Sequence, residues 1–227
     1  MSNNSQSLFK KYLLIGVVTT LIMLAVSAYG WTQLPAGAEI PIHWNLAGEV
    51  DRTTGKVEGF LALPAVSMAI FFLLAWIPKI EPRKMNIEQS AKAYLASGVV
   101  FGGLMLMLQI FIVLASMGYN VNTTAVMTAA AGVMFIVMGN FMGKIRSNYI
   151  FGMRTPWTLS SELSWNKTHR LTGKLLMAFG LIVLVLVATV SATNALIYTG
   201  CGLFLIVILS SVYSYFVWRN DPAAQQA

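Results

Sequence analysis

The sequence predicts an all-α polytopic membrane protein, a bundle of six transmembrane helices with both termini in the cytoplasm. Apolar residues make up 57% of the 227 residues and charged residues only 10%, whereas soluble domains are about 25% charged. Six stretches are long and apolar enough to cross the roughly 30 Å hydrocarbon core of a bilayer. The basic residues gather in alternate connections between these stretches, which predicts an orientation.

The six apolar spans are predicted to be helices. They are apolar on all sides rather than at every second position, which argues against the strands of a membrane barrel. In lipid each backbone group also needs a partner within its own segment. The predicted spans are residues 12–31, 60–77, 93–117, 124–142, 175–193 and 196–218.

The first span, residues 12–31, has some features of a secretory signal peptide. Lys10 and Lys11 precede it, and Val26, Ser27 and Ala28 could form a cleavage site. Its apolar stretch is longer than the roughly 7–15 residues of a signal peptide. We therefore expect it to remain as a transmembrane helix.

The basic residues divide unequally between the two sides of the bundle. The two tails and the second and fourth connections hold 13 of them, and the other connections hold only Arg52 and Lys56. Basic residues collect in cytoplasmic loops, so the tails and these two connections are predicted to be cytoplasmic. The same rule explains the net charge of +7 without a nucleic-acid partner.

Two connections are long enough to carry function. Residues 1–90 form a two-helix region with an extracellular loop at 32–59, and residues 91–227 form a four-helix region with a cytoplasmic loop at 143–173. The connections at 118–123 and 193–194 are short, as between antiparallel neighbours. The last residues, 221–227, are expected to form a frayed tail.

The extracellular loop holds a compact polar motif. Pro41 and Gly48 predict a structured loop rather than a helix, in which Trp44 lies at the membrane interface and Asp51 caps a turn. Four acidic residues against two basic ones favour a cationic ligand. The spacing of its histidine and acids matches no standard metal site, so metal binding is only an alternative. The candidate ligand-binding residues are His43, Trp44, Asn45, Gly48 and Asp51.

The cytoplasmic loop carries six basic residues against Glu162. Thr155 followed by Pro156 is typical of a helix N-terminus, so we expect a short helix from about residue 156 to 170. With Trp157 and Trp165 on one face, it would lie along the membrane surface. The candidate ligand- or partner-binding residues are Asn140, Lys144, Asn148, Arg154, Thr155, Pro156, Trp157, Trp165, Thr168, His169 and Arg170.

Several uses of the cytoplasmic loop stay open. It could contact anionic lipid and anchor the chain, or Arg154, Arg170 and Lys174 could clamp a phosphate or carboxylate while His169 serves as acid or base. Because the loop has one carboxylate and no nucleophile pair or phosphate-binding loop, we expect no enzyme and no cofactor. The charge-free centres of the spans argue against an ion-coupled transporter.

Both loops resemble those of a known bacterial family. The outer stretch resembles the domain of unknown function (DUF1648) that precedes the SdpI domain in many bacterial proteins, and the inner stretch resembles the SdpI signature. The outer match comprises Pro41, Ile42, His43, Trp44, Asn45, Gly48 and Asp51. The inner match comprises Gly139, Asn140, Lys144, Asn148, Gly152, Arg154, Thr155, Pro156, Trp157, Thr158, Leu159, Trp165, Thr168, His169, Arg170 and Gly173.

The resemblance implies a bacterial plasma-membrane protein of the SdpI type. Such a protein would confer immunity to a secreted, membrane-active toxin peptide and hold a cytoplasmic repressor at the membrane when toxin is present. The outer loop would then meet the toxin, and the inner loop would meet the repressor or anionic lipid. The alternative is a protein that binds lipid phosphate at the inner membrane face, or a membrane enzyme acting there.

Overall fold

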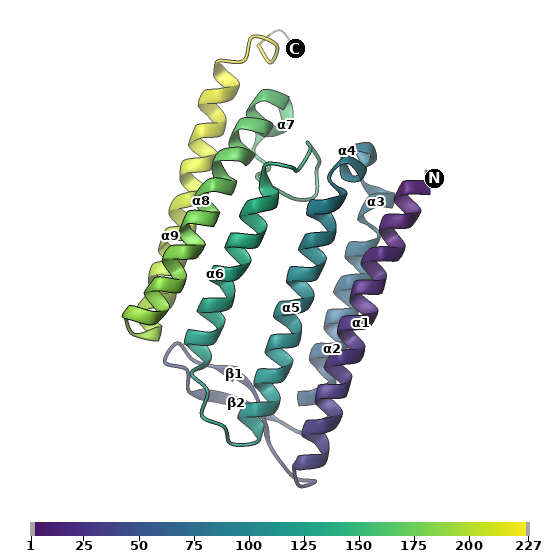
Figure 1. The fold of residues 1–227 in the computed structure, drawn as a ribbon, viewed down its shortest axis with the longest axis vertical. Helices are drawn as coiled ribbons and strands as arrows, with labels where there is room; N and C mark the ends of the chain where they lie inside the picture. Colours follow the sequence, from purple (N-terminus) through teal and green to yellow (C-terminus); the bar gives the residue numbers. More distant parts are fainter. Residues whose placement is uncertain (1–2, 226–227) are drawn as a thin grey trace.

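The computed structural model describes residues 3–225 as six long helices with short elements at their ends (Figure 1). All six long helices are long and apolar enough to cross a membrane, so the predicted helix bundle is confirmed. The elements in chain order are α1 (Asn3–Gln33), β1 (Ile40–Trp44), β2 (Val50–Thr54), α2 (Lys56–Ala75), α3 (Ile77–Ile80), α4 (Lys84–Gln89), α5 (Ala91–Ser116), α6 (Thr123–Met142), α7 (Pro156–Ser160), α8 (Glu162–Thr189) and α9 (Ala192–Arg219).

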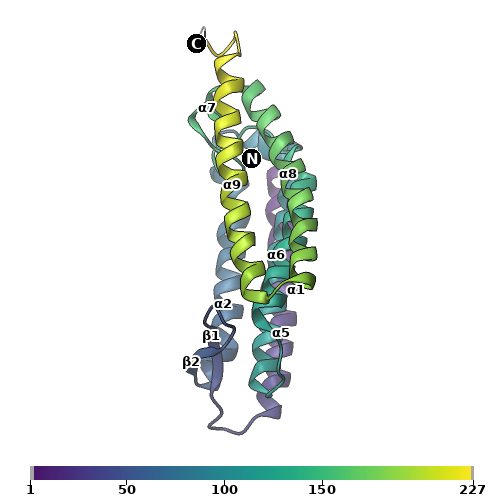
Figure 2. The same cartoon turned by 90° about the vertical axis from the view of Figure 1, so that its left-hand side faces the viewer.

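The long helices pack in two groups of three. One group contains α1, α2 and α5, the other contains α6, α8 and α9, and the groups meet where α5 contacts α6. Figure 2 shows α2 and α9 on one side of a layer formed by α1, α5, α6 and α8. In the first group Tyr12 stacks on Tyr94 with ring centroids 4.5 Å apart, and in the second Phe135 and Val183 are buried together.

Glycines bring α6 and α8 into backbone contact. A Cβ atom added at Gly139 would lie 2.7 Å from the carbonyl oxygen of Gly173, and one added at Gly180 would lie 2.5 Å from that of Gly132. Small residues allow such approach between membrane helices. This close helix pair leads directly to the loop between α6 and α7.

The two ends of the bundle differ in content. Both ends of the chain lie at one end, together with α3, α4 and α7, and the β1–β2 hairpin lies at the other (Figure 1). We call these the basic end and the hairpin end. The connections predicted to share one side of the membrane therefore do lie together, whereas the side on which they lie stays a prediction.

The prediction for residues 156–193 was wrong in three places. The expected helix at 156–170 is interrupted at Ser161, whose backbone is extended (φ −139°, ψ 119°) and whose side chain accepts a hydrogen bond from the Ser164 N–H. Residues 162–174 form the first turns of α8 rather than a surface helix, because no proline separates them from the apolar span. The turn before α9 lies at 190–191, where Ser191 caps that helix.

The predicted extracellular loop contains a β-hairpin that sequence analysis missed. β1 and β2 pair antiparallel, with Ile40 opposite Thr54 and Trp44 opposite Val50. Each strand has only five residues, and β1 contains Pro41, a residue that usually argues against a strand. At the turn Gly48 has a φ of +84°, a conformation that favours glycine.

Candidate functional site

At the hairpin end, the two strands bring His43 and Asp51 together. His43 Nδ1 lies 2.6 Å from Asp51 Oδ1, and both side chains are exposed. Asp51 therefore does not cap the turn as predicted. Asn45 does so, because its Oδ1 accepts from the N–H groups of Ala47 at 2.9 Å and Glu49 at 3.0 Å.

The hairpin rests on both groups of helices. The Trp44 ring meets Phe111 of α5 edge-on, with centroids 4.8 Å apart, and Ile40 is fully buried. The turn lies near α6, since a Cβ atom at Gly48 would be 3.2 Å from Thr124 Oγ1. Packing of Trp44 against α5 holds the His43–Asp51 pair at a defined place.

The exposed charge of the hairpin end is more acidic than the sequence count indicates. Lys56 is buried, and its Nζ donates to the carbonyl oxygens of Trp31 at 2.7 Å and Leu34 at 2.8 Å, so this cation caps the end of α1. Arg52 is the remaining base of the segment. The exposed acids are Glu39, Glu49, Asp51 and Glu58. This surface suits a cationic ligand.

At the basic end, the fully buried pair of Trp165 and His169 organises the loop between α6 and α7. Their rings stack with centroids 4.0 Å apart. His169 Nε2 accepts from the Met153 N–H at 3.0 Å, which requires the proton to be on Nδ1, and Nδ1 lies 2.8 Å from the Trp165 carbonyl oxygen. Trp165 Nε1 donates to the carbonyl oxygen of Ile145 at 2.7 Å. His169 therefore has no free nitrogen for acid–base chemistry, contrary to the sequence hypothesis.

Other residues of the motif also fold the loop. The buried Asn148 accepts at Oδ1 from the N–H groups of Ile150 and Phe151, both at 2.8 Å, and donates to the Arg146 carbonyl. Thr155 and Thr158 form a capping box at the start of α7.

The predicted anion clamp is not assembled. Arg154 donates to the Tyr149 carbonyl oxygen. Arg170 and Lys144 instead line an open pocket whose lining does not include Arg154 or Lys174. The three basic side chains of the hypothesis therefore do not converge.

The remaining candidates lie apart from that pocket. Asn140 and Pro156 are exposed, and Trp157 contacts Tyr215 of α9 at 5.3 Å between centroids. Thr168 is fully buried, and its hydroxyl has no hydrogen-bond partner among the described residues. Within residues 3–225 there is no group of three His, Cys, Asp or Glu side chains that could hold a metal ion.

Sequence analysis missed the residues of the α3–α4 segment that hold this loop. The buried Glu81 carboxylate accepts from the Tyr149 N–H at 3.2 Å. Arg83 donates to the Ser147 hydroxyl, to the Tyr149 hydroxyl at 3.1 Å and to the Leu159 carbonyl at 3.2 Å. The available signal for Glu81 was an acid placed between Lys79 and Arg83 in a basic connection.

The start of the predicted frayed tail is ordered. Asp221 is buried, and its Oδ2 accepts from the Ser161 hydroxyl at 2.5 Å. Asp221 thus ties the end of α9 to the break between α7 and α8, which corrects the prediction for this residue. Residues 226–227 lie outside the described part of the chain.

Two known families match parts of this chain. Residues 144–214 match the SdpI/YfhL protein family, and residues 18–68 match a domain of unknown function, DUF1648. The chain is 29% identical over 207 residues to a protein named Immunity protein SdpI from Bacillus subtilis (strain 168), and the match covers 91% of this chain and 96% of that protein. No solved structure matches the chain.

Proposed function

We propose that this chain is a bacterial membrane immunity protein, because it carries a DUF1648 region followed in sequence by an SdpI/YfhL family region. The observation that carries the proposal is the match to Immunity protein SdpI across nearly the whole of both chains. The match extends well beyond the two family regions, since it covers 207 of the 227 residues. The proposed role is binding and protection without catalysis.

The hairpin end is the surface proposed to meet a secreted, membrane-active toxin peptide. The 13 basic residues predicted to lie on the opposite side favour a cytoplasmic position for the basic end and both termini, which leaves the hairpin outside. The exposed acids there favour a cationic peptide. The His43–Asp51 pair, at 2.6 Å, offers directional hydrogen bonds on a surface fixed by Trp44.

The basic end is the surface proposed to signal to a cytoplasmic repressor. Its loop is folded around His169 and Trp165 and is tied to the α3–α4 segment through Arg83. A loop held in one shape by both helix groups can report a rearrangement of either group.

Deletion of the gene should sensitise cells to a membrane-active peptide. Wild-type protein should restore growth, and His43→Ala should restore less at equal membrane abundance because the cross-strand pair is lost. Val50→Ala is the matched control, since Val50 is an exposed apolar neighbour in the same strand as Asp51, and it should restore growth fully. Growth of the deletion strain equal to wild type across a panel of cationic and apolar peptides would refute the immunity role.

A further inference from the structure

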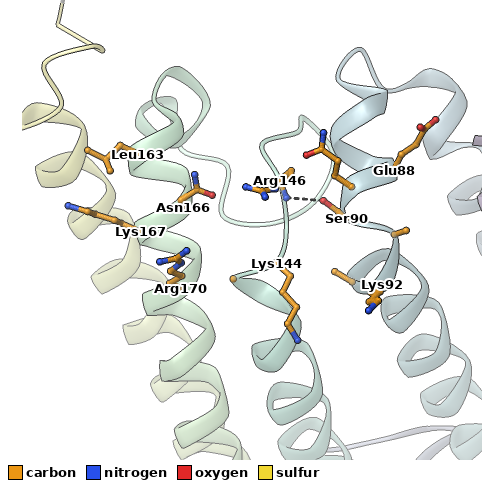
Figure 3. Close-up of a pocket in the computed structure, with 13 residues that line it drawn as sticks. Glu88, Ser90, Lys92, Lys144, Arg146, Leu163, Asn166, Lys167 and Arg170 are labelled. Atoms are coloured by element: carbon orange, nitrogen blue, oxygen red, sulfur yellow. Dashed lines mark hydrogen bonds between the residues drawn. The ribbon is translucent and has the colours of Figure 1, made fainter. Parts of the chain in front are cut away.

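A pocket at the basic end gathers cations from segments far apart in the sequence. It has a volume of about 800 Å³ and lies between the start of α5, the end of α6 and the first turns of α8 (Figure 3). The charged residues that line it are Lys92, Lys144, Arg146, Lys167, Arg170 and Glu88. Five cations therefore surround one open space with a single carboxylate.

None of these five cations is neutralised by a protein carboxylate within residues 3–225. The one ion pair there is His43–Asp51, at the opposite end of the bundle. Glu88 accepts from the Ser5 hydroxyl at 2.5 Å. All five basic side chains are exposed, so they can turn toward a bound anion.

Membrane topology explains why these residues are on one side but not why they converge. The positive-inside rule asks only that they lie in cytoplasmic segments. Lys92 is the second residue of α5, where the helix dipole disfavours a cation. Ser90, before that helix, makes no side-chain hydrogen bond to its first turn and instead accepts from the Arg146 N–H at 2.8 Å. A bound anion would offset both the mutual repulsion of the cations and the positive helix end.

An apolar groove of about 280 Å³ lies between α5 and α6, farther from the basic end than the pocket. Val137 lies seven residues beyond Ala130 on α6, which is close to two helical turns. The helix ends five residues later at Met142, and Lys144 lies two residues beyond that end. Lys92 and Gly103 are eleven residues apart on α5, about three turns, and therefore lie on the same face of that helix. The groove is hollow at Gly103, where an added Cβ atom would meet no other atom within 4 Å. We call the pocket and the groove together the α5–α6 seam.

We propose that the α5–α6 seam binds one anionic phospholipid, with its phosphate among Lys92, Lys144 and Arg170 and one acyl chain in the groove beside Gly103. A basic pocket at the end of membrane helices suits an anionic headgroup, and the apolar groove offers room for an acyl chain. A lipid in this position would fill the junction between the two helix groups. This inference goes beyond the proposed immunity function and does not depend on it.

The charge requirement can be tested on the purified full-length chain in mild detergent, by native mass spectrometry during titration with phosphatidylglycerol. Wild-type protein should retain one phosphatidylglycerol and bind phosphatidylcholine of the same chain length at least about tenfold more weakly. Lys144→Gln combined with Arg170→Gln should weaken phosphatidylglycerol binding by roughly tenfold to thirtyfold, from about 1 kcal/mol for each basic side chain near a lipid surface.

The matched control is Lys84→Gln combined with Lys174→Gln. It removes the same charge from exposed positions outside the pocket, and it should bind as wild type does. Equal loss in the two double variants, or equal affinity for phosphatidylcholine, would overturn the pocket as the binding site.

The need for an acyl chain distinguishes a phospholipid from a soluble phosphate. Gly103→Leu should fill the groove and weaken phosphatidylglycerol binding, whereas Gly200→Leu, also facing open space but on α9, should not. Glycerol phosphate at the same concentration should fail to displace the lipid. If Gly103→Leu binds as wild type, or glycerol phosphate competes on equal terms, the ligand is a headgroup alone and the phospholipid proposal fails.

Discussion

His169 shows how a residue typical of chemistry can serve folding instead. Its ring is fully buried, stacks on Trp165, accepts from the Met153 N–H and directs its other nitrogen to the Trp165 carbonyl. Gly152 fits directly against this ring with a φ of +106°. An added Cβ atom there would lie 2.4 Å from His169 Nε2, so this position combines a backbone and a packing requirement.

Gly152→Ala should lower the free energy of unfolding by more than Gly118→Ala. Gly118 also has a positive φ, +83°, but a Cβ atom there meets nothing within 4 Å. The Gly118 variant therefore isolates the backbone term, about 1–2 kcal/mol, and the Gly152 variant adds roughly 1–3 kcal/mol of overpacking. Denaturant titration of the two variants and the wild-type protein in micelles measures these losses of unfolding free energy. Equal losses of unfolding free energy in the two variants would mean that the loop shifts around His169 at no energetic cost, and this would contradict the prediction.

Single residues of the sites were predictable where they shared a local motif. His43 and Asp51 lie eight residues apart in one loop, and the structure pairs them. Lys144 and Arg170 were both predicted as ligand- or partner-binding residues and line one pocket, but Lys92 of the same pocket belongs to another connection. Glu81 and Arg83 act on residues more than 60 positions away, and no local pattern reports a contact of that range.

Among the elements, α6 and α8 depend most on close approach. Gly139→Ala should lower the free energy of unfolding by roughly 1–3 kcal/mol, because its Cβ atom would lie 2.7 Å from the backbone carbonyl of Gly173, which cannot turn away. Gly103→Ala on α5 is the control, since it meets open space and should be neutral or slightly stabilising. Thermal unfolding in the same detergent measures both. A Gly139→Ala variant as stable as Gly103→Ala would contradict the close packing.

The helices that hydropathy predicts best are those bounded by turn residues or charges. The predicted span at 124–142 and helix α6 (Thr123–Met142) agree to one residue at the start. The continuity of α8 was missed because the polar residues 162–174 were predicted to belong mostly to a separate surface helix. They instead form the first turns of α8, with Trp165 and His169 buried and Arg170 at the basic pocket. The helix break at Ser161 depends on the hydrogen bond that its side chain accepts from the Ser164 N–H. Because Ser160 and Ser164 are also serines, the sequence does not show which serine caps the helix.

For the whole molecule, the charge asymmetry predicts the hairpin end outside and the basic end inside. In a Cys201→Ala background, Ala47→Cys at the hairpin turn should react with a membrane-impermeant maleimide on intact cells. Met85→Cys, which is 71% exposed on α4, should react only after permeabilisation. The reversed pattern would invert the orientation and remove the hairpin from the reach of a secreted peptide.

The contacts between the α3–α4 segment and the loop that follows α6 join the SdpI/YfhL region to a part of the chain that lies between the two matched regions. Asn86 donates to the Ser147 carbonyl at 2.7 Å, and Arg83 reaches Tyr149 and Leu159. A chimera that joined the first 90 residues of one relative to the remainder of another would pair an arginine and a loop from different lineages. Divergence on one side of this junction constrains the substitutions open to the other.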